Sequence, residues 1–293
     1  MKIGPFEINE PLPSMKEPHV ISMLCPWINV GRVGSLTLGQ LENHFGAGEL
    51  GGLARPGEYF DFTRYRPVVK QVEDRRVFSV PNTKISYAPG QDGPDLLFFH
   101  ILEPHNRAEE YTEGILELFK AFGVKRYCRI GGMYDAVPHT RPLLVTGTIA
   151  GKPIRNRSGE ILSARSTYEG PTTILNVASE GAEKLGIENM TLMVHLPQYV
   201  QLEEDHAGVA RLLEVLGQFY DIPSSLLDAE LALDGYKEIG VDVEKNPAAK
   251  ALVERLEANY DLRVGSNPQE SAPLSPEVER FLQGIEQSQD PED

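Results

Sequence analysis

The chain has 293 residues, with 43 acidic and 28 basic side chains and a formal charge of −15 at pH 7. Its composition, 41% hydrophobic and 24% charged, is that of a globular protein large enough to bury a substantial core. So acidic a chain is not expected to bind nucleic acid, whose phosphates require a basic surface. The sequence also lacks the run of about 20 apolar residues that a membrane helix needs.

The two cysteines and the first residues indicate the cellular compartment. Cys25 and Cys128 are far apart in the sequence and both fall in apolar segments, so we expect reduced, buried thiols rather than a disulfide. Residues 1–18 contain no apolar stretch of the kind found in signal peptides. The expected location is therefore the cytoplasm.

The first predicted elements are a strand, a glycine loop and a helix. Residues 1–18, rich in proline and charge, are expected to form an irregular lead-in. The apolar run 19–25 predicts a buried strand. A loop with Gly31 and Gly34 follows, and apolar spacing predicts a helix from Ser35 that stops at Gly46.

The next segments favour β-structure. Residues 50–53 predict a short strand, and 75–89 predict a hairpin that turns near Pro81–Asn82. The continuous apolar run that begins at Asp95 predicts a central strand buried on both faces.

Helices and strands then alternate. Asn106 is a candidate N-cap of a helix whose apolar face carries Tyr111, Ile115, Phe119 and Phe122 and which Gly123 ends. The later expected elements are a strand ending at Gly131–Gly132, a strand at 143–150, a turn near Ser158–Gly159, a helix at 172–185 and a strand at 190–197.

The C-terminal part is expected to be helical. Helices are predicted at 203–220, 224–239 and 246–260, the last with Asn246 as its cap and Pro247 at its first position. A polar linker at 261–274, a short helix from Ser275 and a disordered tail are expected beyond them.

This order of elements predicts the fold class. Alternating strands and helices are typical of a three-layer α/β/α protein with a mostly parallel, mixed sheet. We expect a core domain at 19–200, a helical segment at 201–260 packed on or beside it, and a terminal region at 261–293.

Candidate site residues cluster in two predicted loops. Glycines after the first strand can expose backbone amides to an anion, although a tight turn also explains them. In the segment IGGMYDAVPHTRP, a histidine, a hydroxyl and a guanidinium can all donate hydrogen bonds to a carboxylate or phosphate. The alternative is that Arg141 pairs with a buried acid such as Glu103 or Glu169. The candidate pocket comprises Gly31, Gly34, Glu103, Gly131, Gly132, His139, Thr140, Arg141 and Glu169.

Other chemistry is less well supported. Standard catalytic motifs such as G-x-S-x-G and H-E-x-x-H are missing, and Glu103, His105 and Glu109 are better explained as local structure than as metal ligands. We therefore expect no metal and no cofactor. Arg64 and Arg66, with Arg75 and Arg76 nearby, stand out in so acidic a chain and are candidate interface or ion-pair residues.

Several motifs resemble the proteasome assembly chaperone 2 family of bacteria and archaea. The resemblance covers most of 19–260 and rests on YFDFTRYRP, LEPHNR, IGGMYDAVPHTRP, YEGPTT and HLPQYV, in the family's order. It implies a three-layer fold similar to nucleoside phosphorylases, a helical C-terminal part, and homo-oligomers, with a trimer expected. The family supplies no catalytic residues. The chain ends in Pro291, Glu292 and Asp293 rather than a hydrophobic-Tyr-X tail, so docking on proteasome rings through such a tail is not expected.

Binding is thus favoured over catalysis, although the sequence leaves enzyme activity open. The leading hypothesis is an oligomeric, chaperone-type scaffold with a protein client. The alternative is a binder of, or enzyme for, a small anionic metabolite, nucleoside-like or phosphorylated, at the carboxyl edge of the strands.

Overall fold

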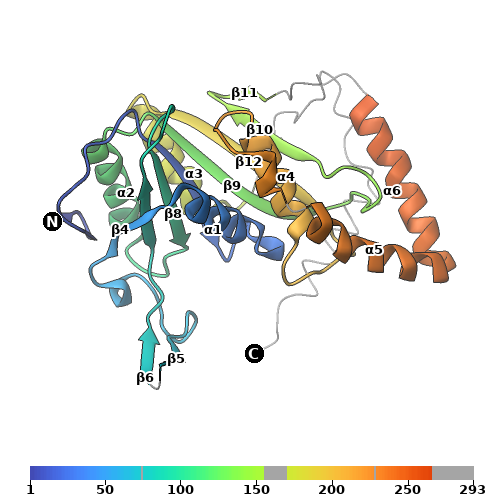
Figure 1. Cartoon of the computed structure of the whole chain (residues 1–293), viewed down its shortest axis with the longest axis horizontal. Helices are drawn as coiled ribbons and strands as arrows, with labels where there is room; N and C mark the ends of the chain where they lie inside the picture. The colour runs from blue at the N-terminus through green and yellow to red at the C-terminus, as the bar shows by residue number, and fades with distance from the viewer. Residues whose placement is uncertain (74, 155–169, 228, 266–293) are drawn as a thin grey trace.

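Figure 1 shows the computed structural model, which describes residues 1–73, 75–154, 170–227 and 229–265. The turn predicted near Ser158–Gly159, the candidate site residue Glu169, the short helix predicted from Ser275 and the tail lie outside these ranges. The strands are β1 (Lys2–Ile3), β2 (Phe6–Ile8), β3 (His19–Cys25), β4 (Gly48–Leu53), β5 (Val68–Val72), β6 (Arg75–Ser79), β7 (Lys84–Ala88), β8 (Leu96–Leu102), β9 (Arg126–Asp135), β10 (Val145–Ile149), β11 (Lys152–Pro153) and β12 (Glu188–Pro197). The helices are α1 (Val33–Phe45), α2 (Ala108–Phe122), α3 (Ile174–Lys184), α4 (His206–Leu216), α5 (Ala229–Lys245) and α6 (Pro247–Gly265), with short 3₁₀ turns at Val30–Arg32, Pro56–Glu58 and Ser224–Leu226.

The main sheet is mixed. Its order in the described part of the chain is β1-β2-β4-β7-β8-β3-β9-β12-β10-β11. The central strands β8, β3, β9 and β12 run parallel, whereas the pairs outside them are antiparallel. Parallel neighbours need a long crossover, and α3 lies in the connection between the parallel neighbours β9 and β12. The short link between β10 and β11, in contrast, gives an antiparallel pair. The α/β fold class is confirmed, but parallel pairing is confined to the centre and does not dominate the sheet.

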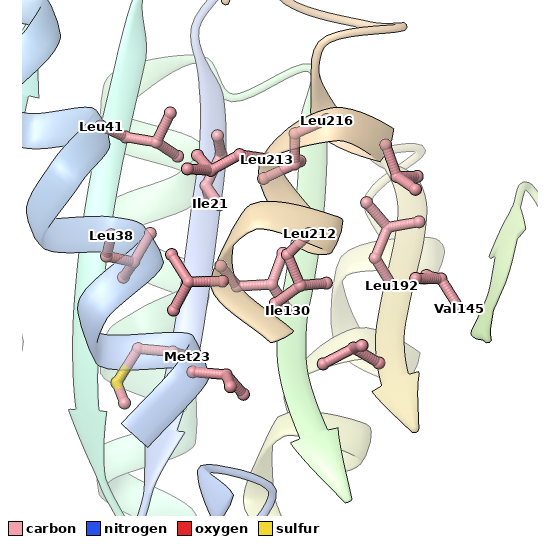
Figure 2. Close-up of a cluster of buried hydrophobic side chains, with 14 of the residues drawn as sticks. Ile21, Met23, Leu38, Leu41, Ile130, Val145, Leu192, Leu212, Leu213 and Leu216 are labelled. Carbon is pink, nitrogen blue, oxygen red and sulfur yellow. The ribbon is translucent and has the colours of Figure 1, made fainter. Parts of the chain in front are cut away.

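Helices cover both faces of this sheet. On one face, Leu38 and Leu41 of α1 and Leu212 of α4 pack on Ile130 and Leu192 from the sheet, as Figure 2 shows. On the other face, Tyr111 and Phe119 of α2 and Ala178 of α3 pack on Phe99 and Tyr127. The continuous apolar runs of β3 and β8 follow from this arrangement, because both faces of each strand are buried.

Helix α2 has the predicted end but a different start. Gly123 closes it with a positive φ of 70°, and Tyr111, Ile115, Phe119 and Phe122 are buried as expected. The cap residue, however, is Arg107, whose carbonyl accepts from the Tyr111 N–H at 3.0 Å. Asn106 is not the cap because its own N–H is bonded to the Tyr59 carbonyl at 3.1 Å.

The hairpin expected near Pro81–Asn82 was wrongly placed. Strands β5 and β6 form a separate two-stranded ribbon, whereas β7 belongs to the main sheet between β4 and β8. The Asn82 side chain bonds both the N–H and the carbonyl of Leu53 at 3.1 Å. This contact fixes the chain as it enters β7. The antiparallel partner of β6 is β5, with pairs from Val68–Ser79 to Val72–Arg75.

The N-terminal segment is more ordered than predicted. Its strands β1 and β2 extend the sheet beyond β4, and Phe6 and Ile8 are buried. Two apolar residues two positions apart, the period of a strand, were the signal that proline and charge obscured.

The C-terminal helices agree in type with the prediction. The Asn246 side chain accepts from the N–H groups of Ala248 and Ala249, at 3.0 and 3.3 Å, and so caps α6. This helix continues to Gly265, into the stretch expected to be a linker. Both cysteines are free. Throughout the described residues, none of the helices combines the length and apolarity needed to cross a membrane.

Candidate functional site

The glycine loop after β3 lies directly against β9. The Gly132 N–H donates to the Ile28 carbonyl at 2.7 Å, and a side chain at Gly131 would place its Cβ 2.3 Å from the same oxygen. Gly31 has a φ of 55°, and its carbonyl accepts from the Asp205 N–H at 2.8 Å. These glycines therefore allow three backbone segments to approach closely, as the turn-geometry interpretation requires.

Gly34 lies in the first turn of α1, beside the glycine loop, and Gly131 and Gly132 lie in the neighbouring strand β9. A Cβ at Gly34 would lie 3.1 Å from the Met23 Cβ, so it too permits close packing. Strand β9 continues to Asp135, so Gly131 and Gly132 lie inside the strand rather than at its carboxyl end as predicted. The strand continues because its parallel pairing with β12 extends as far as the Pro197–Asp135 pair.

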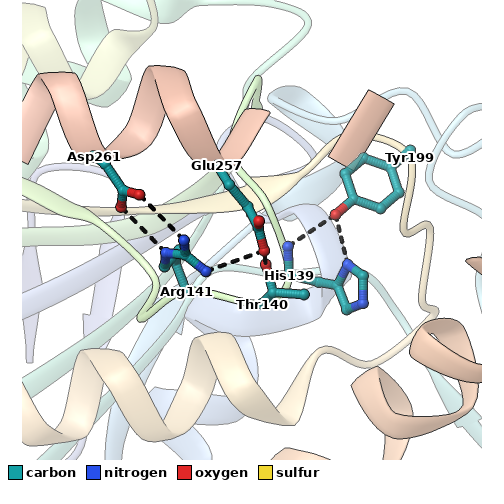
Figure 3. A network of polar contacts seen from close by, with 6 residues as sticks. All are labelled: His139, Thr140, Arg141, Tyr199, Glu257 and Asp261. Carbon is teal, nitrogen blue, oxygen red and sulfur yellow. Dashed lines mark hydrogen bonds and ion pairs between the residues drawn. The ribbon is translucent and has the colours of Figure 1, made fainter. Parts of the chain in front are cut away.

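The loop that carries His139, Thr140 and Arg141 is held by α6 (Figure 3). The Arg141 guanidinium donates to Asp261 with two nitrogens, both at 3.1 Å, and to Glu257 at 3.0 Å. Thr140 donates to the same Glu257 carboxylate. Arg141 therefore does have acidic partners, but they lie about 120 positions later in the chain, and Glu103 is not one of them. Glu169 lies outside the described residues.

His139 lies beside Tyr199 in the same loop. The Tyr199 hydroxyl accepts from the His139 N–H at 2.8 Å and is 2.6 Å from its ring nitrogen Nδ1. Burial lowers the pKa of His139. The two contacts hold Tyr199 against the loop.

Glu103 lies in a different place, at the start of α3. Its Oε1 accepts from the Ile174 N–H at 3.1 Å, so the carboxylate caps that helix. Its Oε2 is buried and has no hydrogen-bond partner among the described residues. Burial raises the pKa of Glu103, against the opposing effect of the Ile174 N–H.

A cleft opens next to Glu103, where β3 and β8 end. Its volume is about 900 Å³, and it lies between these strand ends and residues 57–65. Its lining combines aromatic side chains with polar and charged ones, and Trp27 is 59% exposed. The Tyr65 hydroxyl donates to the Glu103 carbonyl at 3.1 Å, which fixes one wall. We call this the Trp27 cleft; it is lined by Pro26, Trp27, Gly57, Phe60, Asp61, Phe62, Arg64, Tyr65, Glu103, Pro104, His105 and Asn106.

The Trp27 cleft unites two candidate residues that the sequence treated separately. Glu103 and Arg64 both line it, whereas Arg66 is exposed where the chain leaves the cleft toward β5. His105 accepts from the Asp61 N–H at 3.2 Å, so it orders the loop. Carboxyl ends of parallel strands are the usual location of binding sites in open α/β sheets.

One polar network, at the end of β9, was not predicted from the sequence. Asp135 accepts from Nδ1 of His195 at 2.7 Å and from Arg263 of α6 at 3.0 Å, and His195 Nε2 is 2.9 Å from the Thr146 hydroxyl. Burial opposes ionisation of Asp135, but the bonds from His195 and Arg263 outweigh it and hold its pKa well below its usual range. The available signal was that Asp135 and His195 come near the ends of two neighbouring parallel strands.

Arg129 was also missed. This partly buried guanidinium on β9 donates to Thr191 at 2.7 Å and to the Asn176 side chain in the first turn of α3. Among the described residues, its Nε has no hydrogen-bond partner and no carboxylate forms an ion pair with it. Burial lowers the pKa of Arg129.

Over the residues that the structure describes, no group of three or more His, Cys, Asp or Glu side chains converges to hold an ion.

Comparison with solved structures shows the same fold in actinobacterial proteins. A Corynebacterium glutamicum protein of unknown function has 20% identity and a TM-score of 0.76, with 89% of this chain and 98% of that chain covered. A PAC2 family protein from Streptomyces avermitilis has 24% identity and a TM-score of 0.67, covering 80% and 99%. A proteasome-assembly chaperone homologue from Mycobacterium tuberculosis has 23% identity, with the same TM-score and coverage.

Comparison with curated proteins finds no match. The PAC2 family model, in contrast, matches residues 23–234, from the fifth residue of β3 into α5. This range includes the glycine loop, the Trp27 cleft and the Arg141 loop. The chain belongs to the PAC2 family.

Proposed function

We propose that this protein is a cytoplasmic, chaperone-type scaffold that assembles as a homo-oligomer, a trimer in our expectation, and binds protein clients. Membership of the PAC2 family supports the chaperone role, since a structurally similar protein is a homologue of proteasome-assembly chaperones. The clients are then components of a proteasome or of a comparable protein assembly.

The observation that carries the proposal is the β5–β6 ribbon, residues 68–79. It projects from the body in Figure 1. Five of its apolar side chains are between 45% and 68% exposed, namely Val68, Val69, Val72, Val77 and Phe78. An isolated two-stranded ribbon is marginally stable in water, and contiguous exposed apolar surface marks interaction sites. The ribbon is therefore built to contact protein.

The test is retention of proteins by the tagged full chain in its native cells. We expect mass spectrometry to find a defined set of clients that survives salt washing. The matched control is Val177→Asp on α3, an exposed valine away from the ribbon, which is expected to retain the same set. Failure of the wild-type chain to retain any protein under several conditions would contradict the chaperone role.

The second candidate function is binding of a small anionic metabolite, and Arg129 is the observation that favours it. Arg141, the guanidinium named from the sequence, already has two carboxylate partners, whereas Arg129 has none in the described part of the chain. Arg129 also lies beside the N-terminus of α3, whose dipole favours negative charge.

Thermal unfolding with phosphate, nucleotides and phosphorylated sugars tests this candidate. A ligand at a hundredfold excess over its Kd stabilises the native state by about 2.7 kcal/mol. We expect the shift to vanish in Arg129→Gln and to persist in Arg141→Gln. If no compound shifts the melting temperature, the anion-binding candidate is wrong.

A further inference from the structure

A hydroxyl, an imidazole and a carboxylate form a hydrogen-bonded chain across three neighbouring strands. The Thr146 hydroxyl on β10 lies 2.9 Å from Nε2 of His195 on β12, and Nδ1 of the same ring lies 2.7 Å from Asp135 on β9. The Asp135 carboxylate can only accept, so it keeps a proton on Nδ1 and leaves the lone pair of Nε2 for the Thr146 O–H. A base that is oriented in this way and bonded to a hydroxyl is the arrangement that activates the hydroxyl as a nucleophile.

The register of the strands places a cation on the same face. Thr146 is paired with Met193, so His195 and Thr191 are its two diagonal neighbours on β12, each about 7–8 Å away along the backbone. His195 contacts the Thr146 hydroxyl, whereas Thr191 accepts from the Arg129 guanidinium at 2.7 Å. Among the described residues, no carboxylate forms an ion pair with Arg129. A positive charge without a counter-ion therefore lies one diagonal away from the hydroxyl.

This face of the sheet can be reached from solvent beside the imidazole. Met133 is the in-register partner of His195, and its side chain is 42% exposed. His195 itself is buried, whereas Thr146 is only partly buried. The base is thus shielded from bulk water while a substrate can reach the hydroxyl.

We propose that Thr146 is the nucleophile of an esterase site, with His195 as its general base. Asp135 is the positioning residue that orients the imidazole, and Arg129 binds a negatively charged group of the substrate. The substrate class is a carboxylic ester with a second, anionic group, because a hydroxyl nucleophile and a departing alcohol are similar in basicity and an alcohol leaves more readily than an amine. The activity goes beyond the scaffold role, and its preference for anionic esters rests on the anion-binding candidate of the proposed function.

The reaction proceeds in two balanced steps. The Thr146 oxygen forms a bond to the carbonyl carbon while its proton passes to Nε2 of His195; the bond from that carbon to the alcohol oxygen breaks, and the alcohol leaves with the proton from Nε2. Water then attacks the acyl group on Thr146 and gives a proton to Nε2. The acid departs as the Thr146 oxygen recovers that proton, so the site returns to its starting state without an oxidant or reductant.

Release of p-nitrophenol from two esters tests the nucleophile. One is the neutral p-nitrophenyl acetate, and the other is the mono-p-nitrophenyl ester of succinic acid, which adds a carboxylate. We expect the full chain to turn over both, with the lower KM for the succinate ester. Thr146→Val, which keeps the branched shape and removes the hydroxyl, should lose about a hundredfold or more in turnover, whereas Thr146→Ser should retain activity.

The matched control is Thr148→Val. Thr148 lies two residues along β10 and therefore on the same face, but the hydroxyl bonded to His195 is that of Thr146. Thr148→Val is expected to keep the wild-type rate. Circular dichroism should show native folding in each variant, and mass spectrometry of chain quenched with acid during turnover should place the acyl group on Thr146.

The other two residues have separate readouts. Asp135→Asn should lower kcat with little change in KM, because it misorients the imidazole and does not contact substrate. Arg129→Gln should raise KM for the succinate ester and leave the acetate ester unaffected. A purely structural role for either residue would instead change both esters and both constants together with the melting temperature.

Other outcomes overturn the inference. Full turnover by Thr146→Val, or acyl groups found only on other residues, shows that this hydroxyl is not the nucleophile, and a wild-type chain that hydrolyses neither ester excludes the activity. Thermal unfolding separates this failure from that of the anion-binding candidate, which stands if phosphate or nucleotides still stabilise the wild type but not Arg129→Gln. Client retention by Thr146→Val is expected to match the wild type, because the scaffold role does not use this site.

Discussion

Glycine at position 131 determines how closely the loop after β3 can approach β9. The Ile28 carbonyl occupies the space where a side chain would begin, and a backbone oxygen has no rotamer by which to move away. Gly39 in α1 is the opposite case, because nothing lies within 4 Å of the position its Cβ would take. The same residue type thus has a packing role at one site and none at the other.

Gly131→Ala is expected to lower the free energy of unfolding by about 1–3 kcal/mol, the usual cost of overpacking. Gly39→Ala should raise it by up to about 1 kcal/mol, because alanine favours the helix. Urea denaturation of both variants measures the difference. Equal stability of the two variants would show that the loop is free to move away from β9.

Glu42 is a buried carboxylate that joins α1 to the sheet. It accepts from Ser86 at 2.5 Å, and it lies 3.1 Å from Lys84 and 3.0 Å from His100. Burial alone would raise its pKa, but the bonds from His100, Ser86 and Lys84 outweigh burial and lower the pKa to about 2. A depressed carboxylate pKa stabilises the native state above the ordinary value of about 4.3 and loses that contribution as pH falls toward 2.

Glu42→Gln is therefore expected to destabilise the protein by about 1–3 kcal/mol at pH 7. Between pH 4.5 and about 2, the unfolding free energy of the wild type should fall more steeply than that of the variant. Denaturant titrations across this range, with exposed Glu183→Gln as the control, provide the measurement. Parallel pH profiles for wild type and Glu42→Gln would contradict the assignment.

At the scale of elements, α6 is fastened to the sheet mainly through polar contacts. Arg141 bonds Glu257 and Asp261, and the Tyr260 hydroxyl donates to the Pro142 carbonyl at 2.7 Å. Few of its side chains are buried, those of Val253, Leu256 and Tyr260 among them. A helix held in this way can open locally without unfolding the core.

Arg141→Gln should speed amide hydrogen exchange in residues 247–264, because the helix loses the ion pairs of Glu257 and Asp261 with the loop. The melting temperature of the whole chain should change little. Lys250→Gln, which removes only the exposed pair with Glu244, is the matched control. Unchanged exchange in α6 would show that apolar contacts alone hold it.

The sequence predicted best those elements whose signal is local. Buried runs identified β3 and β8, and apolar spacing with a terminal glycine identified α2. Strands β1 and β2 were not predicted, because strands of two and three residues are too short to show a hydrophobic period. The hairpin was misplaced because segments with strand-like mixtures of apolar and polar residues lie on both sides of Pro81, and only tertiary contacts decide which strand joins the main sheet.

At the scale of the whole molecule, the candidate site was partly predictable. The carboxyl ends of the strands follow from the order of elements, and they locate Glu103 and the region of the cleft. The partners of Arg141 and the Asp135–His195 contact join segments tens to more than a hundred residues apart. No local sequence pattern encodes such a pairing. Before the helices are placed in space, any acidic residue on a helix surface is an equally good candidate partner for the Arg141 guanidinium.

The fastening of the Arg141 loop by α6 has a consequence for biosynthesis. Glu257 follows Arg141 by 116 residues, which a ribosome adds in roughly 6–23 s at 5–20 residues per second. During that interval the nascent chain presents the loop without its later helix. Each newly made copy thus passes through a stage in which the Arg141 guanidinium is present and α6 is not. During this stage an acidic neighbouring protein, including an older copy of the same chain, can bind the guanidinium.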